Sequence, residues 1–237
     1  LEQGKENCLF IHVTLVPYLK SSGEHKSKPT QHSVKELQTM GISPDIIVMR
    51  SDEPIDKSIR EKISLFCNVK PDCVIENMTL PVLYEAPIML EKSGFSQIVL
   101  RELGINAGPC EMTEWKSMIE RIKARTEYVK IAVVGKYVKL HDAYLSVAEA
   151  LKHGGYENGC HINIKWVEAE DVTENSVKDI FKDIDGILVP GGFGDRGIEG
   201  KINAARYARE NYIPYFGICL GMQIAVIEFA RNILGIK

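Results

Sequence analysis

The sequence lacks any strong excess of charge of one sign. Its 237 residues carry 29 basic and 32 acidic side chains, which gives a formal net charge of −3. A protein this close to neutrality has no overall field that attracts nucleic acid or an anionic membrane, so any recognition of phosphate must be local. We therefore expect neither nucleic acid nor a membrane among its partners.

Long apolar runs are also missing. The longest, residues 212–227, is interrupted by Gly217, Gly221 and Gln223. It is shorter than the roughly 20 residues that span a bilayer. The first seven residues contain neither an initiator Met nor the apolar core of a signal peptide, which suggests a chain cut from a longer one.

The cysteines form no metal-binding pattern. None of the six pairs as C-x-x-C with histidines at the spacing of a zinc site, so we predict no metal site. A chain of this length needs no disulfides to fold, and reduced thiols in a cytoplasmic protein are expected. The six are Cys8, Cys67, Cys73, Cys110, Cys160 and Cys219.

What is present is the pattern of an α/β protein. Hydrophobic residues make up 45% and charged residues 26% of the chain, enough for one large or two modest domains. Short apolar runs alternate with amphipathic stretches, which is typical of doubly wound, mostly parallel sheets covered by helices. The expected strands are 8–16, 45–49, 64–67, 131–134, 162–166, 186–189 and 215–218. The expected helices are 33–39, 57–62, 113–125, 143–153, 176–181, 198–210 and 222–232.

A boundary between two such units is predicted near the middle of the chain. Gly108-Pro109-Cys110 breaks the preceding pattern, and a charged linker helix with a capping signature is expected at 113–126. The run KIAVVGKY at 130–137 is a buried strand leading into a glycine turn, as at the start of a doubly wound domain. The predicted domains are 1–108 and 130–237, with a linker at 109–129.

The most informative local pattern is PYFGICLGMQ at 214–223, which reads as a strand, a G-x-C-x-G turn and an apolar helix. This is the nucleophile-elbow arrangement with sulfur in place of a serine oxygen. Gly217 and Gly221 permit the close backbone approach that a sharp turn needs, while Cys219 is held in a strained conformation that aims its side chain outward. The alternative is a buried cysteine that only packs.

The start of a helix is a favourable place for a reactive thiol. Unpaired N–H groups and the helix dipole stabilise an anion and so favour the thiolate of Cys219. The N–H of Leu220 could donate to an oxyanion, and the turn PGGFG at 190–194, which follows the strand 186–189, could supply a second donor. In an open parallel sheet both turns fall at the carboxyl edge, where ligands bind.

These motifs resemble a known family. The string GILVPGGFGDRGIE at 186–199 and GICLGMQ at 217–223 closely resemble the class I glutamine amidotransferase domain, in particular that of the CTP synthases. HVTLVPY at 12–18 and KPTQHSVKEL at 28–37 resemble the synthetase domain of the same family. The resemblance implies a partial P-loop-type synthetase domain followed by the first half of a flavodoxin-like amidotransferase domain.

The resemblance also implies a reaction. Glutamine is hydrolysed to ammonia at one site, and ammonia replaces the ATP-activated 4-oxygen of UTP at another, which gives CTP. Cys219 is then the nucleophile that forms a glutamyl thioester, and Gly192 and Leu220 are the oxyanion donors. Gly192 and the segment Leu220, Gly221, Met222 and Gln223 would bind glutamine. Arg196 resembles a lid arginine associated with activation by GTP.

In the first half, the resemblance assigns nucleotide contacts. A basic stretch there is by itself more often a solvated loop, but the string KPTQHSVKEL favours a site. The residues expected at UTP, or at CTP as feedback inhibitor, are Lys26, Ser27, Lys28, Pro29, Thr30, Gln31 and Lys62. The residues expected on the adenine side of ATP are Met78, Thr79 and Leu80.

Parts of the family's machinery are missing from the sequence. It contains no G-x-x-x-x-G-K-[ST] loop for ATP, and the ligands of the Mg²⁺ that accompanies ATP are expected outside it. No histidine resembles the general base that the nucleophile needs. We expect an internal piece of a homotetrameric CTP synthase, inactive when isolated. The alternatives are another class I amidotransferase or peptidase-like enzyme, or a catalytically silent UTP/CTP-binding or assembly protein.

Overall fold

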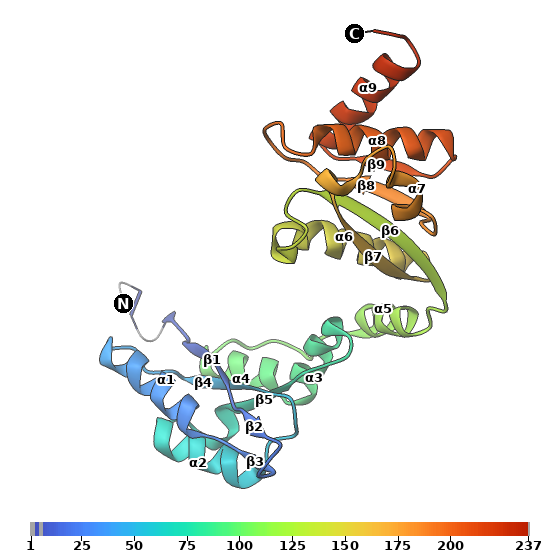
Figure 1. Cartoon of the computed structure of the whole chain (residues 1–237). Coiled ribbons are helices and arrows are strands. Elements are labelled where there is room, and N and C mark those ends of the chain that lie inside the picture. The colour runs from blue at the N-terminus through green and yellow to red at the C-terminus, as the bar shows by residue number, and fades with distance from the viewer. Residues whose placement is uncertain (1–2, 5–6, 237) are drawn as a thin grey trace. The chain divides into compact units, whose positions relative to one another are not determined.

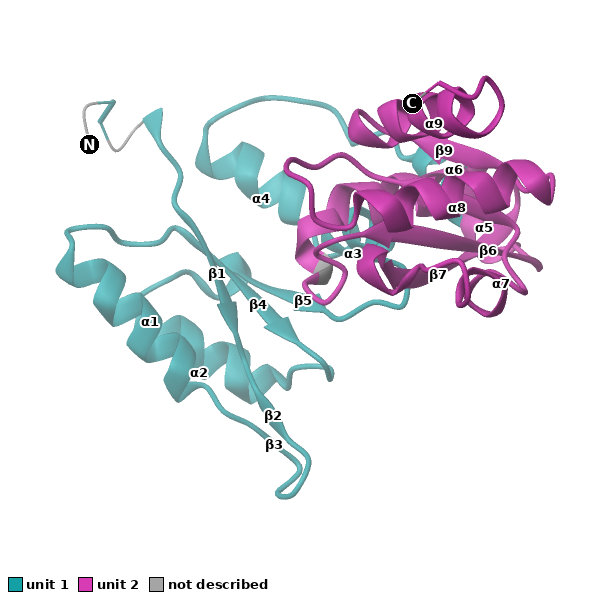
Figure 2. Cartoon of the chain, turned by 45° about the horizontal axis from the view of Figure 1, so that its top comes forward, with its two compact units in different colours: residues 1–119 teal, residues 120–237 magenta. Residues whose placement is uncertain are grey.

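The computed structural model of the chain describes residues 3–4 and 7–236, with His141 described by its backbone alone. The chain forms two compact units, residues 1–119 and 120–237 (Figure 2). The division falls within helix α5 (Thr113–Lys123), inside the stretch predicted as a linker helix. The predicted domain limits at 108 and 130 stay a prediction.

Unit 1 is built on a parallel three-stranded sheet in the order β1-β4-β5 (Figure 1). The strands are β1 (Ile11–Leu15), β4 (Ile46–Ser51) and β5 (Val74–Met78), and the crossover helices are α1 (Lys28–Thr39) and α2 (Lys57–Cys67). Both crossovers step across the sheet in the same direction, from β1 to β4 and from β4 to β5. Right-handed crossovers of this kind place their helices on the same face of the sheet, so α1 and α2 lie side by side. The short helices α3 (Ala86–Lys92) and α4 (Phe95–Glu102) lie on the other side of the sheet (Figure 1).

One sequence prediction in unit 1 is wrong. Residues 64–67 were expected to form a strand, but they form the last turn of α2. Ile63 and Cys67 are buried four residues apart, whereas Leu65 between them is 78% exposed. Burial at this spacing belongs to one face of a helix, and a short apolar run cannot distinguish the two structures.

A small hairpin joins β1 to α1, and the sequence did not predict it. Its strands β2 (Tyr18–Leu19) and β3 (Glu24–His25) pair antiparallel. Gly23 takes a φ of +65° at the turn, a conformation that glycine adopts without strain. The hairpin leads directly into α1, and Pro29 lies in the first turn of that helix.

Unit 2 has a parallel four-stranded sheet in the order β7-β6-β8-β9. Its strands are β6 (Glu127–Gly135), β7 (Cys160–Glu168), β8 (Gly186–Val189) and β9 (Tyr215–Gly217). Its helices are α6 (Leu145–Glu157), α7 (Val177–Ile180), α8 (Ile198–Glu210) and α9 (Leu220–Asn232). The predicted doubly wound α/β class is confirmed, and α8 has the predicted bounds.

The strand order of unit 2 determines where a ligand can bind. From β6 the chain first moves to β7 on one side, and it then returns to β8 on the other side of β6. The reversal opens a crevice at the carboxyl ends of β6 and β8, the usual ligand position in open α/β sheets. Lys136 follows β6 at this edge, and the turn 190–194 follows β8.

The buried residues form separate cores in the two units. In unit 1, Val34 of α1 and Ile63 of α2 pack with Ile47 of β4. In unit 2, Ala132 of β6 and Ile187 of β8 pack with Ala204 of α8. Within residues 3–4 and 7–236, no helix is long and apolar enough to cross a membrane.

Candidate active site

Cys219 lies in the tight turn between β9 and α9, at the carboxyl edge of the sheet of unit 2. Its backbone has a φ of +53° and a ψ of −105°, which an L-residue rarely adopts, and its side chain is exposed. Strain of this kind persists only where the surrounding structure fixes it. The sequence predicted both the strained conformation and the outward thiol.

The two flanking glycines are required by close backbone contacts. A β-carbon on Gly217 would lie 2.3 Å from the carbonyl carbon of Gly221, and one on Gly221 would lie 2.0 Å from the carbonyl oxygen of Val189. The N–H of Ile218 donates to that same Val189 oxygen at 2.9 Å. The Tyr215 hydroxyl donates to the Gly221 carbonyl at 2.7 Å, and burial raises the pKa of this phenol.

The turn after β8 lies against the cysteine turn. A β-carbon built on Gly191 would lie 3.5 Å from the β-carbon of Cys219, and one on Gly192 would lie 3.9 Å from Cδ2 of Leu220. Within the described chain, neither the N–H of Gly192 nor that of Leu220 donates a hydrogen bond. The two predicted oxyanion donors therefore come from neighbouring turns and have no acceptor of their own.

The remaining residues predicted to bind glutamine lie at the start of α9. Gly221 is buried against β8, while the side chains of Met222 and Gln223 are exposed. The N–H of Gln223 donates to the carbonyl of Cys219 at 3.2 Å, which closes the first turn of the helix. The backbone of this segment is thus fixed next to Cys219, whereas the exposed side chains of Met222 and Gln223 are not.

Two hydrogen bonds connect the turn after β8 to the end of β6. The ammonium of Lys136 donates to the carbonyl of Phe193, and the guanidinium of Arg196 donates to the carbonyl of Lys136. Arg196 also lies 3.7 Å from Glu170 and 4.0 Å from Glu168. The predicted lid arginine is therefore half-exposed and paired, while the neighbouring Phe193 ring is 90% exposed.

A second lysine beside this turn was missed by the sequence reasoning. Lys201 of α8 is 1% exposed, and its ammonium lies 4.0 Å from the position of a β-carbon on Gly192. Burial lowers the pKa of Lys201, and the charges of Lys136 and Arg196 lower it further. The signal was available, because Lys201 falls on the apolar side of a helix whose neighbours Ile202, Ala204 and Ala205 are buried.

No described histidine side chain of unit 2 lies beside the thiol. His161 lies at the start of β7, where its Nε2 is 3.1 Å from the carbonyl of Arg125, and His153 lies near the end of α6. Since α6 runs antiparallel to the strands, both rings belong to the amino edge of the sheet, opposite Cys219. The described chain thus offers a nucleophile and oxyanion donors without an imidazole base.

In unit 1, the structure brings several predicted nucleotide residues together. A hollow of about 630 Å³ opens between the β2–β3 hairpin, the start of α1 and α2. Residues 26–28 line it together with Lys62, which is more than 30 positions away in the sequence. Lys26 donates to Glu24 at 2.7 Å and holds the pKa of that carboxyl below its usual value. The hollow is lined by Gly23, Glu24, His25, Lys26, Ser27, Lys28, Asp56, Ser58, Ile59 and Lys62.

Other predicted nucleotide residues do not line this hollow. Thr30 is buried and donates to the carbonyl of Leu15 at 3.2 Å, while Gln31 donates to the Ser27 hydroxyl at 3.1 Å. Pro29 is exposed in the first turn of α1. The Thr30 hydroxyl and the side-chain nitrogen of Gln31 are thus engaged within the protein.

The adenine-side segment lies at the end of β5. Met78 pairs with Ser51 of β4, and the Thr79 hydroxyl donates to Asp52 at 2.7 Å, while Leu80 is half-buried. Sequence reasoning missed His25, whose Nε2 lies 3.1 Å from the Ser51 hydroxyl. His25 therefore links the hairpin of the lysine-lined hollow to the strand that borders Met78.

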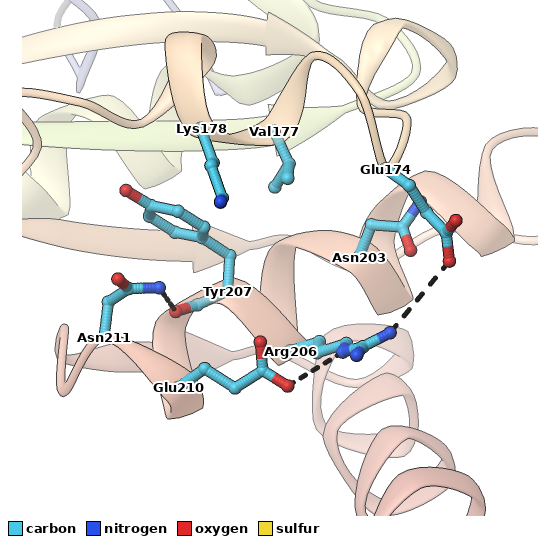
Figure 3. A pocket seen from close by; sticks show the side chains of 8 residues that line it. All are labelled: Glu174, Val177, Lys178, Asn203, Arg206, Tyr207, Glu210 and Asn211. Atoms are coloured by element: carbon cyan, nitrogen blue, oxygen red, sulfur yellow. Dashed lines mark hydrogen bonds and ion pairs between the residues drawn. The ribbon is translucent and has the colours of Figure 1, made fainter.

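A further hollow lies on unit 2, between α7 and α8 (Figure 3). Its volume is about 370 Å³, and it opens beside the carboxyl-terminal half of α8, toward the amino edge of the sheet. Arg206 is held there by Glu210 at 2.8 Å and Glu174 at 4.0 Å (Figure 3). The described residues that line it include neither cysteine nor serine, and we assign it no function.

The described residues also bear on metal binding and redox chemistry. All six cysteines are free. Among residues 3–4 and 7–236, no three His, Cys, Asp or Glu side chains are grouped so that they could hold a metal ion.

Comparison with protein families assigns both units. The family model described as "Glutamine amidotransferase class-I" matches residues 139–237, so unit 2 belongs to the glutamine amidotransferase class. The family model described as "CTP synthase N-terminus" matches residues 1–105. With these two matches in one chain, and with the relatives below, the chain belongs to the CTP synthase family.

Two relatives with similar sequences agree with this assignment. The chain is 59% identical over 231 residues to the CTP synthase of Clostridium kluyveri, which covers 98% of this chain and 43% of that protein. It is 56% identical over 234 residues to that of Listeria innocua, covering 99% and 44%. The chain thus spans less than half the length of these relatives. A solved structure, the glutaminase domain of Trypanosoma brucei CTPS with bound acivicin, is 44% identical over 45% of this chain and 42% of that one, with a TM-score of 0.43.

Proposed function

We propose that this chain belongs to an enzyme that takes ammonia from glutamine at Cys219 and uses it to aminate UTP to CTP. The observation that carries the proposal is the strained turn of Cys219, which lies against the Gly192 turn with two unused N–H donors. A nucleophile and donors so arranged suit attack on an amide carbonyl.

The first half-reaction follows from this geometry. The sulfur of Cys219 attacks the side-chain amide carbon of glutamine, and the N–H groups of Gly192 and Leu220 donate to the resulting oxyanion. Collapse of this intermediate breaks the C–N bond, releases ammonia and leaves a glutamyl thioester. Water then attacks the thioester, glutamate leaves, and the thiol is regenerated. Protonation of the leaving nitrogen requires a general acid, and no described histidine side chain of unit 2 lies beside the thiol to supply it.

The second half-reaction would use unit 1. The hollow lined by Lys26, Lys28 and Lys62 suits a nucleoside triphosphate, because ammonium groups are suitable point charges for phosphates. We assign it UTP, with CTP as a competing feedback inhibitor, and we assign the adenine of ATP to residues 78–80. Ammonia displaces the ATP-phosphorylated 4-oxygen of UTP, which gives CTP, ADP and phosphate.

Other parts of the activity would come from outside these residues. We propose that residues outside this chain hold the Mg²⁺ that accompanies ATP, since the sequence contains no G-x-x-x-x-G-K-[ST] loop for ATP. We propose GTP as an activator that acts through Arg196, and a homotetramer as the active assembly. Because no histidine of the sequence resembles the general base of the family, we propose that the 237-residue polypeptide alone does not turn glutamine over. The six free cysteines support a cytoplasmic location.

The test uses the protein expressed from its gene with whatever sequence flanks these residues. CTP formation from UTP and ATP is measured with glutamine and, separately, with ammonium chloride as the nitrogen source. Cys219→Ala should abolish the glutamine-dependent reaction and leave the ammonium-dependent one intact. Loss of neither reaction would refute Cys219 as the nucleophile. Glutamine hydrolysis by the isolated 237-residue chain would refute its predicted inactivity.

The lysine-lined hollow favours one second candidate, a protein that binds UTP or CTP without catalysis. The same assays distinguish the two functions. Binding of UTP by equilibrium dialysis, with no CTP formed from either nitrogen source, would support the silent binding protein and reject the enzyme.

A further inference from the structure

Lys201 carries a buried ammonium for which the structure shows no partner. Its residue is 1% exposed, and among the described residues no group accepts a hydrogen bond or forms an ion pair with its side chain. Burying an unpaired charge costs several kcal/mol in general, and proteins usually avoid it. A lysine retained in such a place calls for an anion that compensates the cost.

The position of Lys201 identifies where that anion would lie. Its ammonium is 4.0 Å from the β-carbon position of Gly192, and Cδ2 of Leu220 is 3.9 Å from the same point. Leu220 follows Cys219 directly, and the β-carbon of Cys219 is 3.5 Å from the β-carbon position of Gly191. The buried charge is therefore next to both turns that surround the thiol and the oxyanion position.

The two other cations nearby are already engaged. The ammonium of Lys136 donates to the carbonyl of Phe193, and Arg196 donates to the carbonyl of Lys136. The carboxylates of Glu168 and Glu170 lie 4.0 and 3.7 Å from the guanidinium of Arg196, and Oε1 of Glu168 is buried without a hydrogen bond among the described residues. Burial and the two neighbouring cations lower the pKa of Lys201, as expected for a charge with no counterion.

We propose that Lys201 is a positioning residue of the amide-hydrolysis site, whose charge stabilises the negative charge that forms on the sulfur of Cys219 and on the tetrahedral oxygen. The inference rests on the proposed role of Cys219 as nucleophile. It requires no direct contact with substrate, because an ammonium acts over this distance through a site of low dielectric. The charge of Lys201 is thus closest to the Gly192 turn, which is proposed to hold the tetrahedral oxygen.

The test measures the thiol directly and does not need turnover. The 237-residue chain is treated with iodoacetamide between pH 5.5 and 9.5, and alkylation of each cysteine is followed by peptide mass. Cys110, which is also exposed, is the internal reference. A unit charge that acts over about 10 Å at an effective dielectric of about 20 shifts a pKa by roughly one unit. On this scale, Lys201→Met should raise the midpoint of Cys219 alkylation by roughly one pH unit.

Three further variants separate charge from packing. Lys201→Gln should show the same upward shift as the Met variant, whereas Lys201→Arg should keep the wild-type midpoint. Lys178→Met removes an exposed lysine of α7 and the same formal charge, so it should shift nothing. Far-UV circular dichroism confirms that each variant is folded before it is labelled.

The possible results bear differently on the two proposals. If Cys219 reacts faster than Cys110 at neutral pH but the Met and Gln variants keep the wild-type midpoint, the role of Lys201 is refuted and the nucleophile stands. If Cys219 of the wild-type chain reacts no faster than Cys110, the role of Lys201 is refuted, and the nucleophile is decided by Cys219→Ala in the longer protein. If the Lys178→Met control shifts the Cys219 midpoint by the same amount, the shift depends only on the net charge of the chain. That result would also refute the role of Lys201.

Discussion

Replacing Gly221 with alanine should force helix α9 away from strand β8. The new β-carbon would lie 2.0 Å from the carbonyl oxygen of Val189 and 2.9 Å from its carbonyl carbon. Both are backbone atoms of a central strand, so neither can rotate away as a side chain could. Since an ordinary C···O contact is about 3.3 Å, the helix must move by roughly 1.3 Å.

The energetic cost follows from three contributions. Overpacking of this kind typically costs about 1–3 kcal/mol. The hydrogen bond from the Ile218 N–H to Val189, now 2.9 Å, is lost or lengthened at a cost of about 1 kcal/mol. Alanine in a helix returns about 1 kcal/mol relative to glycine. We expect Gly221→Ala to lower the free energy of unfolding of unit 2 by about 2 kcal/mol.

The chain offers a matched control in the same unit. Gly154 of α6 has nothing within 4 Å of its β-carbon position, and its φ is not positive. Gly154→Ala should therefore stabilise unit 2 by about 0.4–1 kcal/mol through the unfolded state. Urea unfolding is followed by the fluorescence of Trp166 on β7, in a Trp115→Phe background so that unit 1 contributes no tryptophan signal.

With a slope of about 2 kcal/mol/M, the urea midpoint should fall by about 1 M for Gly221→Ala and rise slightly for Gly154→Ala. If both alanines stabilise unit 2 by the same amount, the close approach of α9 to β8 is wrong. The strain attributed to the turn at Cys219 would then lose its structural basis, because the same contact fixes that turn.

Two further predictions concern the same neighbourhood. Lys201→Met should stabilise unit 2 by about 1–3 kcal/mol at pH 7, because it removes a buried unpaired charge. Since the pKa of Lys201 is lowered in the folded state, the unfolded chain binds more protons below pH 10.5, and the advantage of the Met variant should shrink as the pH rises toward 10.5. Urea titrations at several pH values measure this, and an advantage that does not change with pH would contradict a buried charge at Lys201. Tyr215→Phe should cost about 1 kcal/mol by removing the 2.7 Å hydrogen bond to Gly221. Because burial raises the pKa of Tyr215, this tyrosine's contribution should decline above pH 10 in the wild type, and a Phe variant as stable as the wild type at pH 7 would contradict the hydrogen bond.

The elements that the sequence predicted well are long and strongly patterned. Helix α8 has a buried face in Ile202, Ala205 and Ala208 at helical spacing, and both of its ends were placed correctly. The strand β8, a run of four buried residues, was equally clear. Residues 64–67 failed because an apolar run of four fits a strand and a helix alike, and only tertiary packing decides between them. Strand β5 was missed because Glu76 and Asn77 interrupt its short apolar pattern.

Some residues of the candidate sites could likewise be predicted from local sequence patterns, and others could not. The glycines and the thiol of the cysteine turn were predictable, because their backbone requirements leave a signature in the sequence. The joining of Lys62 to residues 26–28 in one hollow was expected from the family resemblance alone, since no local rule connects α2 to the hairpin. Thr30 shows the limit of transferring a motif, because its hydroxyl is used within the core and is not available to a ligand.

Lys201 is the residue where sequence reasoning fails most informatively. A helix face that carries Ile202 and Ala205 should by packing alone carry an apolar residue at 201 as well. Local rules are broken without compensation mainly at functional sites, where stability is given up for chemistry. Opposite effects of Lys201→Met on stability and on the reactivity of Cys219 would therefore be the expected outcome. A variant that loses both would mean that the lysine only packs, and that its charge is compensated by a group outside the described chain.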